Sequence, residues 1–258
     1  MNTDAIVLSR IVKTYGALQA VADLSLIVPV GQFVALVGAS GSGKTTLLKM
    51  INGLITPDSG EVRVLGGDVL SSDQSALRRK VGYVFQEVGL FPHMTVGENI
   101  AIGPRLERWS KDRADARTRE LLDLVALPQT VTERLPSELS GGQRQRVGVA
   151  RALAAGPRIM LMDEPFGALD PIVRDGLARD YRALHDRLGL TTVMVTHDIM
   201  EALRLADRVV VMSEGRVLAE DSPRALLSGH PDARVRDLID TPKRQADEVR
   251  ALAGDAGA

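Results

Sequence analysis

The residues most clearly suited to chemistry form a glycine-rich string, Gly-Ala-Ser-Gly-Ser-Gly-Lys-Thr, at positions 38–45. Glycines at this spacing let the backbone curl so that successive N–H groups point inward at phosphate oxygens. Lys44 is then placed for the β- and γ-phosphates, and the Thr45 hydroxyl for a Mg²⁺ ion. The string predicts a site for the phosphate chain of a nucleotide.

The flanking sequence has the context that a phosphate loop needs. The apolar run at 33–37 predicts a buried strand, and residues 45–51 predict a helix that ends at Asn52-Gly53. The N-terminus of that helix adds its partial positive charge to the site. A chance Gly/Ser-rich turn would not require this context. The residues predicted to hold the nucleotide here are Gly38, Ala39, Ser40, Gly41, Ser42, Gly43, Lys44, Thr45 and Thr46.

Two carboxylates follow another predicted strand. The apolar run 159–162 ends in Asp163-Glu164-Pro165. Asp163 is suited to hold Mg²⁺ through a water, and Glu164 to polarise an attacking water as a general base. Such a pair could also be an ordinary solvated turn. Downstream of a phosphate loop, the catalytic interpretation is the stronger one.

A second glycine motif, Leu-Ser-Gly-Gly-Gln, occupies residues 139–143. Ser140 and Gln143 have the spacing of a helix capping box, so one interpretation is a well-capped helix over 144–155. That interpretation leaves the double glycine unexplained, because glycine costs helix propensity. Bare N–H groups at a helix N-terminus form an anion site. We therefore expect both a cap and a second grip on phosphate.

These motifs resemble those of the nucleotide-binding subunits of ABC transporters, over roughly residues 6–227. Seven strings match that family, in the order that the family has. They are Tyr15 at the aromatic that stacks on adenine, 38–45 at the Walker A loop, Gln86 at the Q-loop glutamine, 139–143 at the signature motif, Asp163 and Glu164 at Walker B and its catalytic glutamate, Ala168-Leu169-Asp170 at the D-loop, and His197 at the switch histidine.

The resemblance implies hydrolysis of ATP with Mg²⁺. Glu164, His197, Gln86 and Lys44 are the implied catalytic residues, and Thr45, Gln86 and Asp163 the implied metal ligands. It also implies a second copy of the chain, bound head-to-tail. Each copy would complete the other's site with its signature motif, which is Leu139, Ser140, Gly141, Gly142 and Gln143.

The same resemblance implies membrane partners. These are permease subunits in the membrane and, indirectly, an extracytoplasmic solute-binding protein, with this chain at the cytoplasmic face of the membrane. The stretches 84–100 and 162–171 resemble those of bacterial importers. Residues 88–93 and 239–245 are most similar to the osmoprotectant group, which takes up quaternary amines such as glycine betaine, choline or carnitine. Importers of amino acids, polyamines or sulfonates remain alternatives.

A non-transport ABC-type ATPase that acts on DNA or ribosomes is the rival hypothesis. Against it stand a single cassette, the lack of a long coiled-coil insertion, and a net charge of −1, which gives no strong field for nucleic acid. A nucleotide kinase or GTPase would leave the second glycine motif unexplained, and the sequence contains no Asn-Lys-x-Asp string. We expect no nucleic-acid partner.

Composition agrees with a large intracellular domain. The 258 residues are 45% hydrophobic, enough for a substantial core, and contain no cysteine, which fits a reducing compartment. No apolar run approaches the roughly 20 residues that span a bilayer. The N-terminus lacks the basic start of a secretory signal. The short stretch after the last predicted strand leads us to expect no C-terminal regulatory domain of the kind that some osmoprotectant members carry.

Alternating strands and helices predict an α/β fold with a parallel core sheet. Together with the resemblance, this gives a P-loop NTPase (RecA-like) core, an antiparallel β subdomain and an inserted helical subdomain. We expect one ABC ATPase domain over 1–240, with core and β subdomain at 1–85 and 159–220, the helical subdomain at 86–158 and C-terminal helices at 221–240. A helix starting after Asp170 should bury Val173, Leu177, Tyr181, Leu184 and Leu188, and residues 241–258 should form a loosely held tail.

Overall fold

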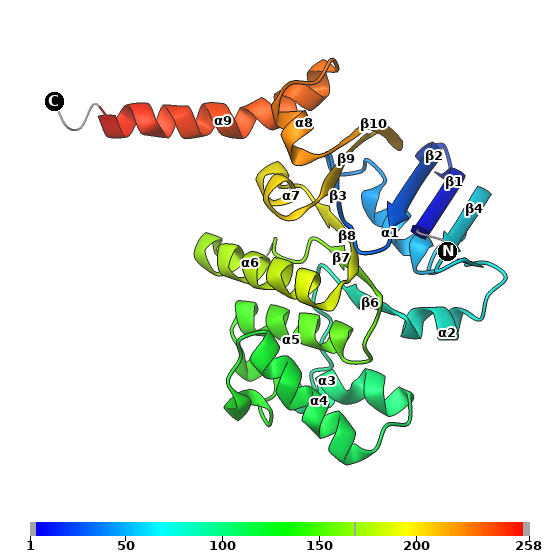
Figure 1. Ribbon diagram of the computed structural model, residues 1–258, viewed down its shortest axis with the longest axis vertical. Coiled ribbons are helices and arrows are strands. Elements are labelled where there is room, and N and C mark those ends of the chain that lie inside the picture. The colour runs from blue at the N-terminus through cyan, green and yellow to red at the C-terminus, as the bar shows by residue number, and fades with distance from the viewer. Residues whose placement is uncertain (1–3, 168, 255–258) are drawn as a thin grey trace.

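The computed structural model describes residues 4–167 and 169–254 of the chain, and its strands form two sheets (Figure 1). The smaller sheet is antiparallel with strand order β2-β1-β4-β5. Its strands are β1 (Asp4–Tyr15), β2 (Leu18–Pro29), β4 (Ser59–Val64) and β5 (Gly67–Asp68).

The larger sheet carries the core of the fold, in the order β10-β9-β3-β8-β7-β6. All its pairs are parallel except β10 with β9. Continuous burial of β3 and β7 explains why residues 33–37 and 159–162 are unbroken apolar runs, since both faces of a parallel sheet are covered. β8 is equally buried, although three of its six residues are threonines. The strands are β3 (Phe33–Val37), β6 (Val81–Val84), β7 (Ile159–Asp163), β8 (Thr191–Thr196), β9 (Arg208–Ser213) and β10 (Arg216–Asp221).

The two faces of this sheet pack into two separate cores. Val34 and Leu36 of β3 join a cluster with the antiparallel sheet and helix α1 (Lys44–Ile51). Phe33 and Val37, one residue out of phase, join a second cluster with helices α6 (Pro171–Leu188) and α7 (Ile199–Leu205). The alternation follows from the two-residue period of a strand.

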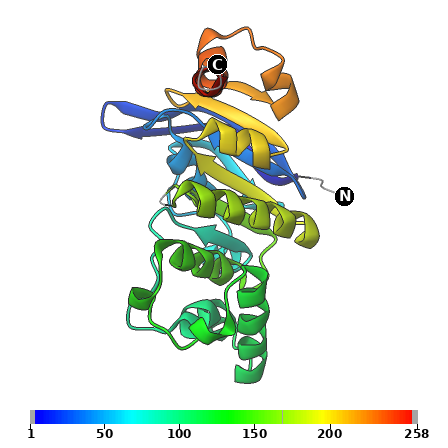
Figure 2. The same cartoon turned by 90° about the vertical axis from the view of Figure 1, so that its left-hand side faces the viewer.

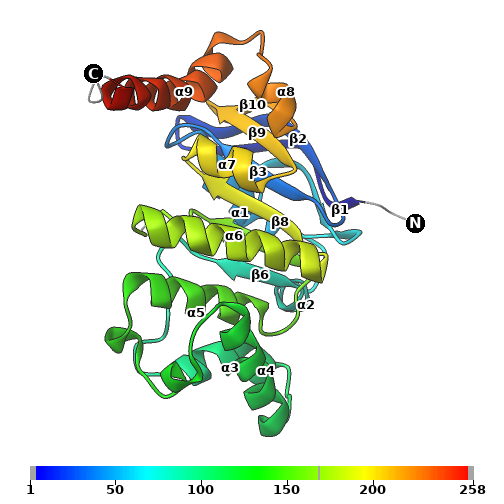
Figure 3. The same ribbon diagram turned by 60° about the vertical axis from the view of Figure 1, so that its left-hand side comes forward.

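Helices fill the chain between β6 and β7 and form one end of the molecule, drawn in green in Figures 1 and 3. Helix α5 packs on α3, α4, α6 and β6. These elements are α3 (Val96–Leu106), α4 (Lys111–Leu124), the 3₁₀ turns η1 (Gln129–Val131) and η2 (Pro136–Glu138), and α5 (Gly141–Leu153); α2 (Gln74–Arg79) precedes β6. A parallel core, an antiparallel β sheet and an inserted helical part are thus all present, and the predicted fold class is confirmed.

The C-terminal helices lie at the end opposite the helical insertion (Figure 2). Helix α8 (Pro223–Leu227) leads to α9 (Ala233–Gly254), which buries Val235 and Ile239 and then projects away from the body (Figure 1). Residues 241–254, predicted as a loosely held tail, therefore continue a helix. The charged, alanine-rich composition that suggested a tail is also the composition of strong helix formers. The last four residues lie outside the described part of the chain.

Helix α6 begins and ends where the sequence predicted, but its buried face differs at both ends: Val173 is only partly buried, and Leu188 is exposed. Asp170 caps its N-terminus by accepting a hydrogen bond from the Val173 N–H, and Gly189 ends it in the left-handed conformation. Leu188 is 42% exposed rather than buried, and His185 takes a core position instead. The apolar period alone did not reveal which side chain of the last turn is buried.

Candidate active site

The glycine-rich string forms the loop between the end of β3 and the start of α1, as the sequence predicted. Gly38 and Gly43 have φ angles of 149° and 97°, which residues with a side chain rarely adopt. A Cβ on Gly38 would lie 2.1 Å from the carbonyl oxygen of Met212, and one on Gly43 would lie 2.2 Å from that of Ala20. Only glycine fits at these two positions, so the course of the loop depends on them.

The Lys44 side chain is folded back along this loop. Its Nζ donates to the carbonyl oxygens of Gly38 at 2.7 Å and Ala39 at 2.8 Å, and to Ser42 Oγ at 3.1 Å. Burial lowers the pKa of Lys44, while the nearby carboxylates of Glu164 and Asp163 act in the opposite direction. The ammonium group therefore lies inside the loop, within reach of any anion that the loop binds.

Thr45 and Asp163 are in direct contact. The Thr45 hydroxyl donates to Asp163 Oδ1 at 2.9 Å. Burial raises the pKa of Asp163; Lys49, Lys44 and the Thr45 hydrogen bond oppose this shift. A hydroxyl beside a carboxylate at a phosphate loop is a donor set suited to Mg²⁺, which prefers oxygen ligands and keeps several waters.

Three of the predicted catalytic side chains meet at one carboxylate oxygen. Glu164 Oε2 accepts a hydrogen bond from Gln86 Nε2 at 3.1 Å and lies 3.3 Å from His197 Nδ1. The three residues follow β6, β7 and β8, which are neighbouring parallel strands, so their carboxyl ends meet at one edge of the sheet. The structure therefore brings together a carboxylate, an amide and an imidazole beside the phosphate loop.

Tyr15, at the end of β1, lies with its ring 47% exposed. The Lys13 Nζ is 5.4 Å from the ring centroid and pairs with Asp58 at 2.7 Å. Asp58 also accepts a hydrogen bond from the Thr14 N–H at 2.7 Å. Two bonds to one carboxylate thus fix the backbone just before an exposed aromatic ring, which leaves the ring open to stack on a planar group.

The signature-motif residues form the predicted capping box. The Ser140 side chain accepts from the Gln143 N–H at 3.2 Å, and the Gln143 side chain accepts from the Ser140 N–H at 2.9 Å. Leu139 before them is buried. Helix α5, which they start, packs in the helical insertion, whereas α1, which follows the phosphate loop, packs on β2, β4, β7 and β8. Within one chain, the two glycine motifs thus belong to different subdomains.

The two glycines of this motif have different surroundings. A Cβ on Gly142 would lie 2.8 Å from Val173 Cγ1, so close packing of α5 on α6 accounts for that glycine. At Gly141 the nearest atom, Arg144 Nη2, would lie 4.0 Å from a Cβ. The structure thus gives a packing reason for the glycine at 142 and none for the glycine at 141.

Sequence analysis missed the roles of two arginines. Arg151 of α5 donates to the carbonyl oxygens of Val88 at 2.6 Å and Gly89 at 2.7 Å, just after Gln86. Arg174 of α6 donates to carbonyl oxygens of the D-loop on either side of Ala168, a residue that lies outside the described part of the chain. The signal available for Arg151 was its place on the same helix face as Val147, Ala150 and Ala154, which are buried.

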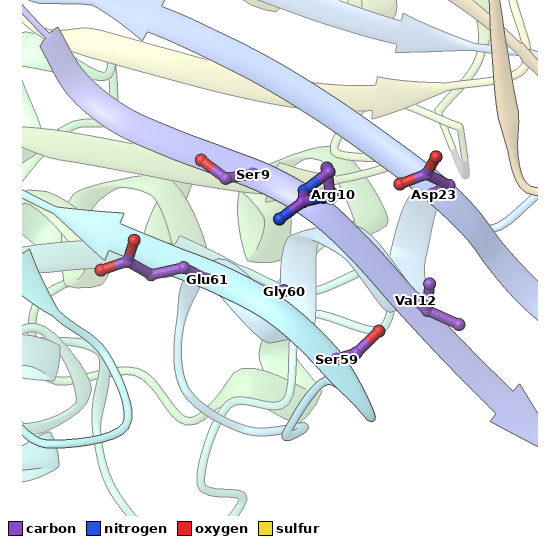
Figure 4. A pocket seen from close by; sticks show the side chains of 7 residues that line it. All are labelled: Ser9, Arg10, Val12, Asp23, Ser59, Gly60 and Glu61. Carbon is purple, nitrogen blue, oxygen red and sulfur yellow. The ribbon is translucent and has the colours of Figure 1, made fainter.

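A separate hollow lies on the antiparallel sheet, between β1, β2 and β4 (Figure 4). It measures about 490 Å³ and is lined by Arg10, Asp23 and Glu61 among others, with none of the predicted site residues.

Across residues 4–167 and 169–254, no group of three or more His, Cys, Asp or Glu side chains is placed to hold a metal by itself. A Mg²⁺ ion at the Thr45–Asp163 contact would therefore need oxygen ligands from the nucleotide as well.

The fold and this arrangement define a class of protein, the ATP-binding cassettes. The chain superimposes with a TM-score of 0.78 on the dimeric, post-hydrolysis structure of the ATP-binding cassette MJ0796 bound to ADP and Pi. The sequences are 34% identical, and the match covers 85% of this chain and 99% of that one. The model of the ABC transporter family matches residues 21–167. The chain belongs to the ABC transporter family.

Two curated relatives have names that specify a transported solute. The carnitine transport ATP-binding protein OpuCA of Listeria monocytogenes is 48% identical over 231 residues, which are 89% of this chain and 58% of that protein. The glycine betaine uptake system ATP-binding protein YehX of Escherichia coli is 51% identical, over 90% of this chain and 75% of its own length. The chain thus spans little more than half the length of the first of these. The osmoprotectant resemblance noted from residues 88–93 and 239–245 is confirmed.

Proposed function

We propose that this chain is the ATP-hydrolysing subunit of an importer for small quaternary amines. The observation that carries the proposal is the meeting of Gln86 and His197 on Glu164, beside a loop that holds Lys44 and next to the Thr45–Asp163 contact. A general base, a cationic phosphate ligand and a metal ligand set are the parts that phosphoryl transfer to water requires.

Each residue has a distinct task in this proposal. The backbone N–H groups of 38–45 and the Lys44 ammonium bind the phosphates, and the Tyr15 ring stacks on adenine. Glu164 orients the attacking water and accepts its proton, while His197 and Gln86 hold the carboxylate in place. Thr45, Gln86 and Asp163 would hold a Mg²⁺ ion, which would neutralise charge on the phosphate oxygens.

The site requires a second copy of the chain. Ser140, Gly141 and Gly142 start a helix on a subdomain away from the phosphate loop, so they serve a nucleotide bound to another copy. The dimeric structure of the cassette MJ0796, similar to this chain at a TM-score of 0.78, supports a pair of chains, and the family resemblance implies that the pair is head-to-tail. Closing on ATP and reopening after hydrolysis then supplies the motion that the transporter uses.

A groove beside the site is suited to a permease. It measures about 610 Å³, lies between the core sheet and the helical insertion, and has the exposed rings of Phe85 and Phe91 and the side chain of Leu106 along it. Phe85 directly precedes Gln86 in the chain, so a partner bound in the groove would contact the segment that carries this catalytic side chain. Exposed apolar side chains in a groove favour an amphipathic helix from a partner. In the described part of the chain, no helix could itself cross a bilayer.

The solute is proposed from the relatives. Proteins named for transport of carnitine and glycine betaine are 48% and 51% identical to this chain. We therefore expect a permease and an extracytoplasmic binding protein for quaternary amines, with this chain at the cytoplasmic face of the membrane and no nucleic-acid partner.

The first test measures ATP hydrolysis by the purified chain and by its complex from native membranes. A tagged chain extracted in two different detergents should bring down a multi-span membrane protein, and the binding protein encoded with it should bind betaine, choline or carnitine. A binding protein that takes only sulfate, an amino acid or a polyamine would contradict the quaternary-amine proposal. Recovery only with nucleic acid would overturn transport.

A matched pair of variants tests the groove. Phe91→Asp should release the chain from the membrane complex and leave nucleotide binding intact, because it places a charge where we expect an apolar contact. Leu188→Asp is the control, since Leu188 is 42% exposed and Phe91 43%. If both variants copurify with the permease equally, the groove is not the docking site.

A further inference from the structure

Arg174 joins two loops that carry the proposed catalytic residues. It lies in the first turn of α6, and its Nη2 reaches back to donate to the carbonyl oxygens of Gly167 at 3.3 Å and Leu169 at 3.0 Å. Its Nη1 lies 3.7 Å from Asp198 Oδ2. One guanidinium group therefore holds the segment after β7 and the turn after β8 at the same time.

The Asp198 end of this contact is itself fixed. Asp198 caps α7 by accepting from the N–H groups of Met200 at 2.9 Å and Glu201 at 3.2 Å. Its own N–H donates to Thr196 Oγ1 at 3.1 Å. His197 lies between Thr196 and Asp198, so these bonds fix the backbone that carries its ring.

Gly167, one of the two residues whose carbonyl oxygens accept from Arg174, lies beside Glu164 and His197. A Cβ on Gly167 would be 3.7 Å from Glu164 Oε2 and 3.8 Å from His197 Cε1. Glu164 has a φ of 46°, a left-handed conformation that costs a non-glycine residue about 1 kcal/mol or more. The Gly167 N–H donates to the Glu164 carbonyl oxygen at 3.2 Å, which supports that conformation. A group that holds Gly167 thereby holds Glu164.

We propose that Arg174 is a positioning residue for hydrolysis, a clamp that keeps Glu164 and His197 in register by tying Gly167 and Leu169 to Asp198. The inference rests on the proposed ATPase function. The guanidinium does not contact the nucleotide loop, so it acts on the rate of the chemical step and not on nucleotide affinity. Lysine, with a single ammonium group, can replace only part of a contact to three oxygens.

The kinetic test compares four variants of the full chain. Arg174→Ala should lower kcat at least about tenfold because small displacements of catalytic groups are costly, with KM for ATP unchanged within error. Arg174→Lys should recover part of the loss. Asp198→Asn keeps the cap and removes the charge, and should fall between wild type and Arg174→Ala. Arg179→Ala is the control, since Arg179 lies on the same helix with its side chain 70% exposed.

A second measurement, hydrogen exchange, tests the Arg174 clamp independently of ATP hydrolysis. Hydrogen exchange should speed up in Arg174→Ala at both 164–170 and 196–199, and in Arg179→Ala at neither. If wild type does not hydrolyse ATP, the proposed function fails while exchange still decides the clamp. Exchange unchanged at either segment overturns the clamp. So does a normal kcat in folded Arg174→Ala, or an Arg174→Lys variant as impaired as Arg174→Ala.

Discussion

Glu164 Oε2 lies 3.3 Å from His197 Nδ1, a distance at which the carboxylate forms an ion pair with a protonated imidazole. The same oxygen accepts from Gln86. One oxygen of Glu164 is thus held by two neighbours, which leaves the other to meet a water. This geometry motivates the first prediction.

Glu164→Gln keeps the shape of the side chain and removes its basicity. We expect ATP hydrolysis to fall on the order of 100-fold or more, the usual contribution of a general base, with ATP binding retained. Steady-state phosphate release and binding of a fluorescent ATP analogue measure the two effects. Glu120→Gln on exposed α4 is the control, and hydrolysis at the wild-type rate in Glu164→Gln would remove the assigned role.

Lys44→Ala should weaken nucleotide binding. A hydrogen bond to a charged group contributes about 1.5–3 kcal/mol, so we expect affinity to fall roughly ten- to a hundredfold. The fluorescent analogue measures this directly. Lys80→Ala at the exposed end of α2 controls for loss of one positive charge. Equal affinity in wild type and Lys44→Ala would contradict the phosphate-loop assignment.

Gly142→Ala should destabilise the isolated chain, because the added Cβ would lie 2.8 Å from Val173 Cγ1. Overpacking of this kind costs about 1–3 kcal/mol, and the double variant Gly142→Ala/Val173→Ala should recover most of it. Gly141→Ala is the control, with open space around it. Urea unfolding provides the measurement. A Gly142→Ala chain as stable as wild type would show that α5 and α6 can separate at no cost.

Stability should decrease in acid through His185. This side chain is buried, with Nδ1 3.0 Å from Thr192 Oγ1, and burial, assisted by Arg182, lowers its pKa from the ordinary value of 6.5. The unfolded chain therefore takes up the proton first as pH falls. The stabilising contribution is complete above the unfolded pKa and is lost as pH falls through it toward the folded pKa.

Urea unfolding at about pH 7.5 and about pH 5.5 tests this. The loss of stability between the two should be smaller in His185→Gln than in wild type. His93→Gln, at an exposed position, should behave as wild type. The same loss in all three proteins would exclude His185 as its source.

Local sequence was enough to predict the elements that are covered on both sides or sharply capped. β3 and residues 159–162 of β7 are short apolar runs because both faces of the sheet are covered, and α6 begins at the Asp170 cap. It was not enough at Leu188 or beyond residue 240. At Leu188, burial depends on which other side chains lie next to it. Beyond residue 240, the charged, alanine-rich composition is compatible with either a helix or a loose tail. No local pattern decides either case.

The phosphate loop could be predicted from the sequence because its ligands are consecutive N–H groups between one strand and one helix. That Gln86, Glu164 and His197 share one oxygen was decided by the tertiary structure. The three residues are far apart in the chain and meet because β6, β7 and β8 are adjacent and parallel. The Arg174 contacts and the packing reason for Gly142 also depend on how α6 lies against its neighbours, which spacing along a chain does not encode.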